Sequence, residues 1–75
     1  MFKVGDIVKV RDNGRIVTHN TPRWAYGELG KVVRLNDFTV TISLLGCYDG
    51  EKIRADYADV MIIRRTGDEQ EAEQG

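Results

Sequence analysis

Residues 30–44 read GKVVRLNDFTVTISL, and this stretch decides the fold. From Phe38 to Leu44 apolar residues alternate strictly with Thr and Ser, which is the period of a β-strand with one buried face. Residues 30–35 are rich in valine, and Asn36-Asp37 is a tight-turn signal between the two runs. The stretch therefore predicts a β-hairpin with Phe38, Val40, Ile42 and Leu44 on one face.

The flanking sequence supplies three more strands and hardly any helix. We predict a first strand at residues 7–10, a fourth at 52–55 and a fifth at 60–64, each rich in Val or Ile. Residues 56–59, DYAD, are expected to form one helical turn. The predicted fold is all-β, a small five-stranded barrel with a long first loop and a one-turn helix before the last strand.

The chain has 75 residues, which suits one domain with one small core. The strand faces that carry the larger apolar side chains define this predicted core. Its members are Val8, Val10, Val33, Phe38, Val40, Ile42, Ile53, Val60 and Ile62.

Charge is divided unevenly along the chain. The net charge is −1, but residues 66–75 contain four acids and no base, so that residues 1–65 carry eleven Lys and Arg against eight Asp and Glu. A tail of this composition cannot bury enough apolar surface to order itself. We therefore predict a mildly basic barrel over residues 1–65 and a disordered acidic tail over 66–75, which either solubilises the protein or screens a basic site.

The order of these elements resembles an SH3-like barrel. The residues that carry the resemblance are GDIVKV at 5–10, the long loop to about Leu29, GKVV at 30–33 and DYADV at 56–60. The resemblance covers about residues 3–64, and it implies that the first loop and the loop at 46–51 lie on the same side of the barrel.

Three subfamilies of this fold remain open. GDIVKV followed by GKVV is similar to KOW-type modules of ribosomal and transcription proteins, whose first loop is usually much shorter. WAYGELGKV at 24–32 resembles the small E-type protein of photosystem I, whose docking surface is basic, whereas this loop includes Glu28. Peptide-binding SH3 domains share a tyrosine in the last helical turn, here Tyr57, but their acidic first-loop motif and ALYDY-like signature are missing.

Residues suited to catalysis or metal binding are few. His19 is the only histidine and Cys47 the only cysteine, and the sequence has no glycine-rich phosphate loop. We therefore expect no enzymatic activity, no cofactor and no metal. No apolar run approaches the roughly 20 residues of a membrane-spanning helix, and residues 1–3 are too short for a signal peptide, so a cytoplasmic protein is expected.

The rarest side chains gather in one stretch, HNTPRWAYGELGKVV at 19–33, which holds the only His, Pro and Trp. Thr21-Pro22 stiffens this loop, and its aromatic residues either anchor it on the barrel or are presented to a partner. We expect Trp24 to be the more buried and Tyr26 or Tyr48 the more exposed. The predicted binding residues are Arg15, Arg23, Trp24, Tyr26, Tyr48 and Tyr57.

Aromatic and arginine side chains suit two classes of partner. They dominate the energetics of protein–protein interfaces, and they also bind phosphates and stacked bases. We expect a non-enzymatic module that binds another protein or protein complex, such as an adaptor or modulator of the kind that compact bacterial or viral genomes encode. The alternative is a KOW-like RNA- or DNA-binding module that uses the basic face.

Overall fold

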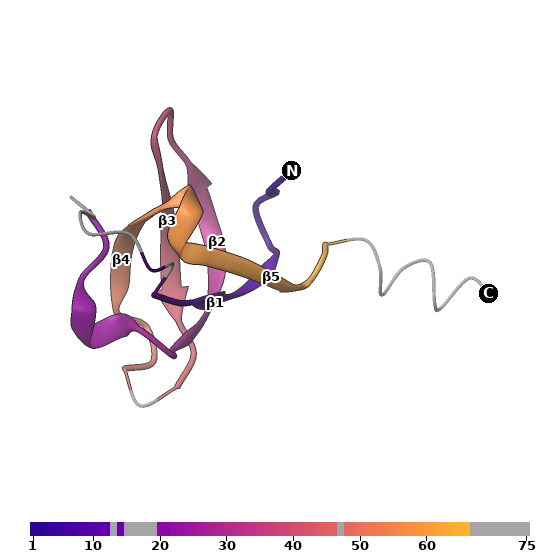
Figure 1. The fold of residues 1–75 in the computed structure, drawn as a ribbon. Helices are drawn as coiled ribbons and strands as arrows, with labels where there is room; N and C mark the ends of the chain where they lie inside the picture. Colours follow the sequence, from indigo (N-terminus) through magenta and orange to yellow (C-terminus); the bar gives the residue numbers. More distant parts are fainter. Residues whose placement is uncertain (13, 15–19, 47, 67–75) are drawn as a thin grey trace.

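The computed structural model describes residues 1–12, 14, 20–46 and 48–66. Within this part of the chain, five strands form one antiparallel sheet in the order β4-β3-β2-β1-β5 (Figure 1). The strands are β1 (Ile7–Val10), β2 (Leu29–Leu35), β3 (Thr39–Leu44), β4 (Lys52–Asp56) and β5 (Val60–Arg64). The all-β prediction is confirmed, with each predicted strand boundary within one residue of the observed one.

Two short 3-10 turns interrupt the connections, η1 (Arg23–Ala25) in the first loop and η2 (Tyr57–Asp59) before β5. η2 confirms the predicted helical turn, whereas η1 was not predicted. No helix of the described residues is long and apolar enough to cross a membrane.

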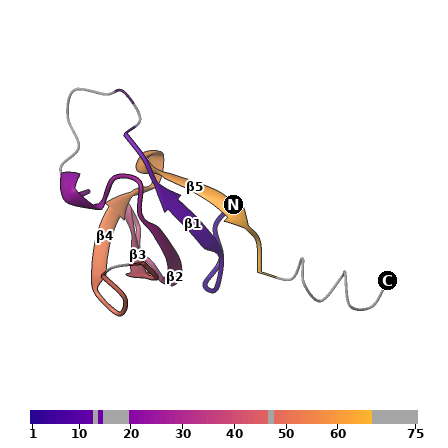
Figure 2. The same cartoon turned by 90° about the horizontal axis from the view of Figure 1, so that it is seen from below.

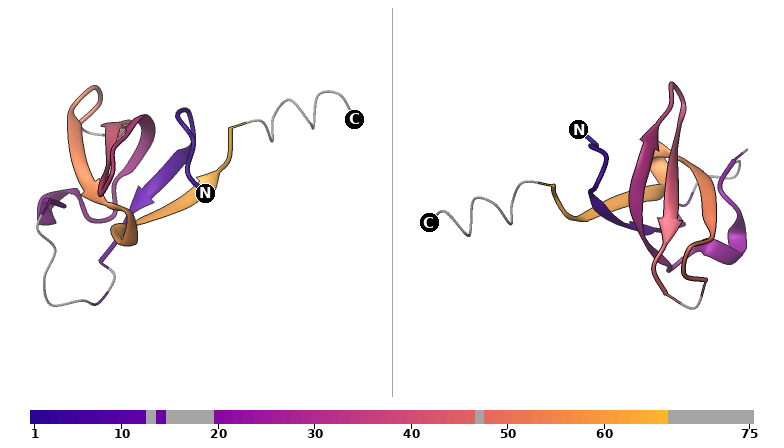
Figure 3. Two further views of the ribbon diagram at one scale, coloured as in Figure 1. Left: turned by 90° about the horizontal axis from the view of Figure 1, so that it is seen from above. Right: turned by 180° about the vertical axis from the view of Figure 1, so that it is seen from behind.

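The sheet curls on itself and has an inner and an outer face. β2, β3 and β4 form one wall, and the β1–β5 pair lies across it (Figures 1 and 2). The views from above and behind show the same small barrel-like arrangement, with η1 beside β4 (Figure 3). Its inside is therefore the place for a core.

One apolar cluster fills this inner space. Six of the predicted core residues are buried in it, and Ile62 is partly buried against it. Phe2, Tyr26 and Tyr57 also pack on its margin. The buried members are Val8, Val10, Ala25, Val32, Val40, Ile42, Leu44, Ile53, Ala55 and Val60.

A bulge in β2 corrects one predicted core residue. Val32 pairs with Ile42 and Arg34 pairs with Thr41, so that the register shifts and leaves Val33 as an extra residue. Val32 is fully buried, while Val33 is 37% exposed. The prediction of Val33 as a core residue was wrong because one inserted residue moves the following side chains to the other face.

The hairpin turn corrects the second. The N–H of Asn36 donates to the carbonyl oxygen of Thr39 at 2.9 Å, and β3 begins only at Thr39. Phe38 therefore stands at the tip of the hairpin and is 84% exposed. The prediction of Phe38 as a core residue was wrong because the turn includes one residue more than Asn36-Asp37.

Asp6 ties the end of β5 to the chain before β1. Its carboxylate accepts the backbone N–H groups of Lys3 at 2.8 Å and Thr66 at 2.7 Å. Burial on its own would raise the pKa of Asp6, but these hydrogen bonds and the charge of Arg65 hold it below the ordinary value. Thr66, the first residue of the predicted tail, is thus bonded to the sheet, and residues 67–75 lie outside the described part.

Candidate functional site

Two loops meet at one end of the barrel through an aromatic pair. The ring centroids of Trp24 in η1 and Tyr48 in the β3–β4 loop are 4.9 Å apart, with an interplanar angle of 56°. The side chains are 48% and 47% exposed. The expectation that the first loop and the loop at 46–51 lie on the same side is confirmed. We call Arg23, Trp24 and Tyr48 the aromatic loop surface.

The order of burial within the first loop differs from the expected one. In η1 the N–H of Ala25 donates to Pro22 at 3.1 Å, and it is Ala25 that is fully buried. Trp24 therefore lies outside, whereas Tyr26 is half-buried against the core. The expectation that Trp24 is the more buried was wrong because the tight turn aims its smallest side chain inward.

Hydrogen bonds to two strands hold this loop in place. The N–H of Gly27 donates to Val10 at 2.7 Å, and the Val10 N–H donates to Glu28 at 2.9 Å. At the other end of the segment, the buried Oγ1 of Thr21 accepts the N–H of Asp56 at 2.8 Å. Gly27 has a φ of +91°, a conformation that favours glycine. The backbone under Trp24 is thus fastened to β1 and β4.

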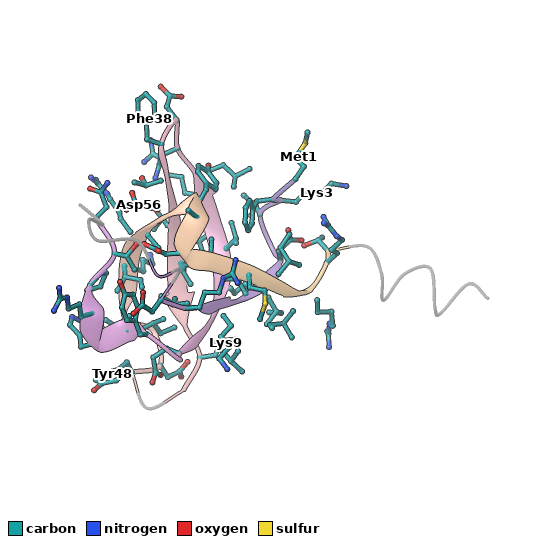
Figure 4. All side chains as sticks on the ribbon, viewed as in Figure 1. Met1, Lys3, Lys9, Phe38, Tyr48 and Asp56 are labelled. Atoms are coloured by element: carbon teal, nitrogen blue, oxygen red, sulfur yellow. The ribbon has the colours of Figure 1, made fainter. Side chains whose placement is uncertain are left out.

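The remaining predicted binding residues do not all join this surface. Tyr57 stacks on Phe2 with ring centroids 5.3 Å apart, and its hydroxyl donates to the carbonyl of Asn36 at 2.6 Å. It therefore lies toward the β2–β3 turn, whose Phe38 is at the opposite end of the molecule from Tyr48 (Figure 4). Arg15 lies outside the described residues.

A second group of side chains, absent from the predicted site, lies on the outer face of β2, β3 and β4. Residues paired directly across antiparallel strands point to the same face. One row of the ladder is Lys31–Ser43–Lys52, and the next is Arg34–Thr41–Arg54. All four cations are exposed. We call Lys31, Arg34, Lys52 and Arg54 the cationic sheet face.

This face was only partly visible in the sequence. The alternation of residues 39–44 shows that Thr39, Thr41 and Ser43 point away from the core, but not which residues flank them. That depends on the register of β4 and on the bulge at Val33, and neither can be read from residue types.

One buried acid has no evident role. The carboxylate oxygens of Asp59 in η2 are fully buried and have no hydrogen-bond partner among the described residues. Its backbone carbonyl accepts the N–H of Arg11 at 2.8 Å, beside the start of the first loop. A buried carboxylate without a partner costs stability. Nothing in the sequence pattern indicated this residue.

Metal chemistry has no candidate in the described part of the chain, where no three His, Cys, Asp or Glu side chains form a group that could hold an ion. His19 and Cys47 lie outside that part. The sequence matches no protein-family model and no curated protein.

Proposed function

We propose that the protein is a small non-enzymatic module with an SH3-like barrel, and that it binds another protein through the aromatic loop surface. The strand order β4-β3-β2-β1-β5 and the η2 turn before β5 support the SH3-like assignment. The observation that carries the proposed function is the half-exposed pair of Trp24 and Tyr48 on fastened loops.

This pair has the properties of an interface anchor. Trp, Tyr and Arg are the residues most enriched at the energetic centres of protein interfaces, because large flat rings bury much area and have few torsions to fix. Contact between the rings already restricts Trp24 and Tyr48, which reduces the entropy lost on binding. The exposed Arg23 next to Trp24 can orient a carboxylate or carbonyl group of the partner.

Affinity capture from a lysate, with and without nuclease, tests the proposal. The variants are Trp24→Ala/Tyr48→Ala and, as the matched control, Phe38→Ala, which removes an exposed ring at the other end of the molecule. We expect a captured protein that survives nuclease, binds the control normally and binds the double variant about thirtyfold more weakly or worse. Loss of every captured partner after nuclease treatment, or normal binding by the double variant, would contradict the proposal.

A further inference from the structure

The cationic sheet face has unbalanced charge. Its four charged groups have no ion-pair or hydrogen-bond partner within the described part of the chain. Of the outward positions on β2, β3 and β4, one is acidic, Asp56, at the end of β4 opposite Thr39. Asp56 accepts a hydrogen bond from the side-chain amide of Asn20 at 3.0 Å. The centre of the face is therefore positive.

The side chains between the cations are hydrogen-bond donors. Asn36 extends its amide over the outer face and donates to Oγ1 of Thr39 and of Thr41, each at 3.2 Å. A hydroxyl that accepts such a bond still has its own O–H to donate. Neither O–H has an acceptor among the described residues. Ammonium, guanidinium and hydroxyl donors thus cover one surface, which complements a ligand made of acceptors.

The bulge at Val33 is what completes this arrangement. In a regular strand, Lys31 would share its face with residues 33 and 35, and Arg34 would point to the core side. The inserted residue places Arg34 opposite Thr41, on the same face as Lys31. With strands about 4.8 Å apart, cations at either side of β3 are separated by roughly 10 Å, and the two rows by roughly 7 Å along the strands. The rigid ladder holds this spacing.

An exposed aromatic ring stands at the end of the same wall. Phe38 lies at the tip of the β2–β3 hairpin, directly between Asn36 and Thr39 of the donor surface in the chain, and is 84% exposed (Figure 4). Proteins that bind single strands combine cations that follow the phosphates with rings on which unpaired bases stack. A paired, stacked base would not be available to this ring.

We propose that the outer face of β2, β3 and β4 binds single-stranded nucleic acid. The cationic sheet face contacts consecutive phosphates, the hydroxyls of Thr39 and Thr41 donate to phosphate oxygens, and a base stacks on Phe38. The site is separate from the aromatic loop surface, and it stands or falls independently of the proposed protein partner.

Fluorescence anisotropy with labelled fifteen-nucleotide oligo-dT and oligo-U tests the electrostatic part. Four phosphate contacts on a single strand predict a salt slope of about −2.8, so that affinity falls about fiftyfold between 50 and 200 mM salt. Arg34→Gln/Arg54→Gln should halve that slope, leaving a fall of about sevenfold. The control Lys3→Gln/Arg11→Gln removes the same charge from exposed positions elsewhere and should keep the wild-type slope. Equal slopes in the two variants would overturn the proposal.

The base contact has its own test. Phe38→Ala should weaken oligonucleotide binding about tenfold without changing the salt slope, because stacking involves no phosphate. Its melting temperature should equal that of the wild type, since the ring is exposed. Unchanged affinity for this variant would overturn the proposal. So would binding to a matched DNA duplex, to heparin or to anionic lipid vesicles as tight as binding to the single strands.

Discussion

The wall of β2, β3 and β4 and the loop end around Trp24 and Tyr48 display side chains by different means. On the wall, the ladder register fixes every outward position, and the displayed groups are polar donors. At the loop end, a few hydrogen bonds to β1 and β4 hold an apolar pair in place. A surface built by strand pairing tolerates little change in its backbone, whereas one built by loops depends on a few anchors. The two should also differ in salt dependence.

The largest predicted effect compares two glycines, one on the wall and one in a loop. A Cβ at Gly30 would collide with Cγ2 of Ile42 and lie 3.1 Å from the Ser43 carbonyl oxygen. Gly30→Ala should therefore cost about 3 kcal/mol in the free energy of unfolding. A Cβ at Gly46 meets the flexible end of Glu28, and Gly46→Ala should cost well under ~1 kcal/mol. Urea denaturation measures both values, and equal losses would refute the distinction between wall and loop.

The next prediction separates anchor from displayed ring within the first loop. Tyr26→Ala removes a ring that packs on the core and should cost about 2 kcal/mol of stability, whereas Trp24→Ala should cost about 1 kcal/mol. Partner binding should show the reverse order. Thermal unfolding of the two variants side by side provides the check. A Trp24→Ala variant that unfolds first would mean that Trp24 is the anchor.

Strand pattern and turn chemistry together predicted the wall nearly residue by residue. The alternation of residues 38–44 identified the inner side chains of β3, and Asn36-Asp37 located the turn. The errors at Val33 and Phe38 have one cause. An extra residue in a strand or turn changes which face follows, and its position depends on how both strands pack rather than on local residue types.

The loop end was predictable only in part. The resemblance to SH3-like barrels implied that two loops lie together, and Trp24 and Tyr48 do so. Which ring is buried depends on η1, a turn of three residues whose hydrogen bonds leave no periodic signal. The cationic sheet face required the register of three strands, so single residues such as Arg34 could not reveal it.

Two buried aspartates outside the wall should respond to substitution in opposite directions. Asp59→Asn removes a buried charge without a partner in the described residues and should stabilise the protein by about 1 kcal/mol at pH 7. Asp6→Asn loses charge-assisted hydrogen bonds and should destabilise it by a similar amount. Chemical denaturation at neutral pH distinguishes the signs. Destabilisation by Asp59→Asn would show that its carboxylate has a favourable role.

The Asp6 contribution should also depend on pH. Because the folded state lowers the pKa of Asp6, the unfolded chain binds the proton first as the pH falls. The stabilisation is therefore complete above about pH 5 and is lost as the pH falls below about 4, through the folded-state pKa. The stability difference between wild type and Asp6→Asn should shrink over that range. A difference that stays constant from pH 7 to pH 3 would contradict this account.

The smallest predicted effect concerns the acidic tail. If its four acids screen the cationic sheet face, a chain ending at Thr66 should bind oligonucleotide about twofold to threefold more tightly at 50 mM salt and equally at 300 mM. Thr66 is kept because Asp6 accepts its N–H. Anisotropy at both salt concentrations measures the change. Equal affinities at 50 mM would leave the tail only a solubilising role.

The separation of the two surfaces can be tested most directly by an NMR titration of the protein with a single-stranded oligonucleotide. We predict saturable shifts of the amides of residues 31–34, 39–43 and 52–55, together with the ring resonances of Phe38, while the indole N–H of Trp24 and the amide of Tyr48 stay in place. Shifts centred on Trp24 and Tyr48, with residues 31–34 and 52–55 unmoved, would contradict it.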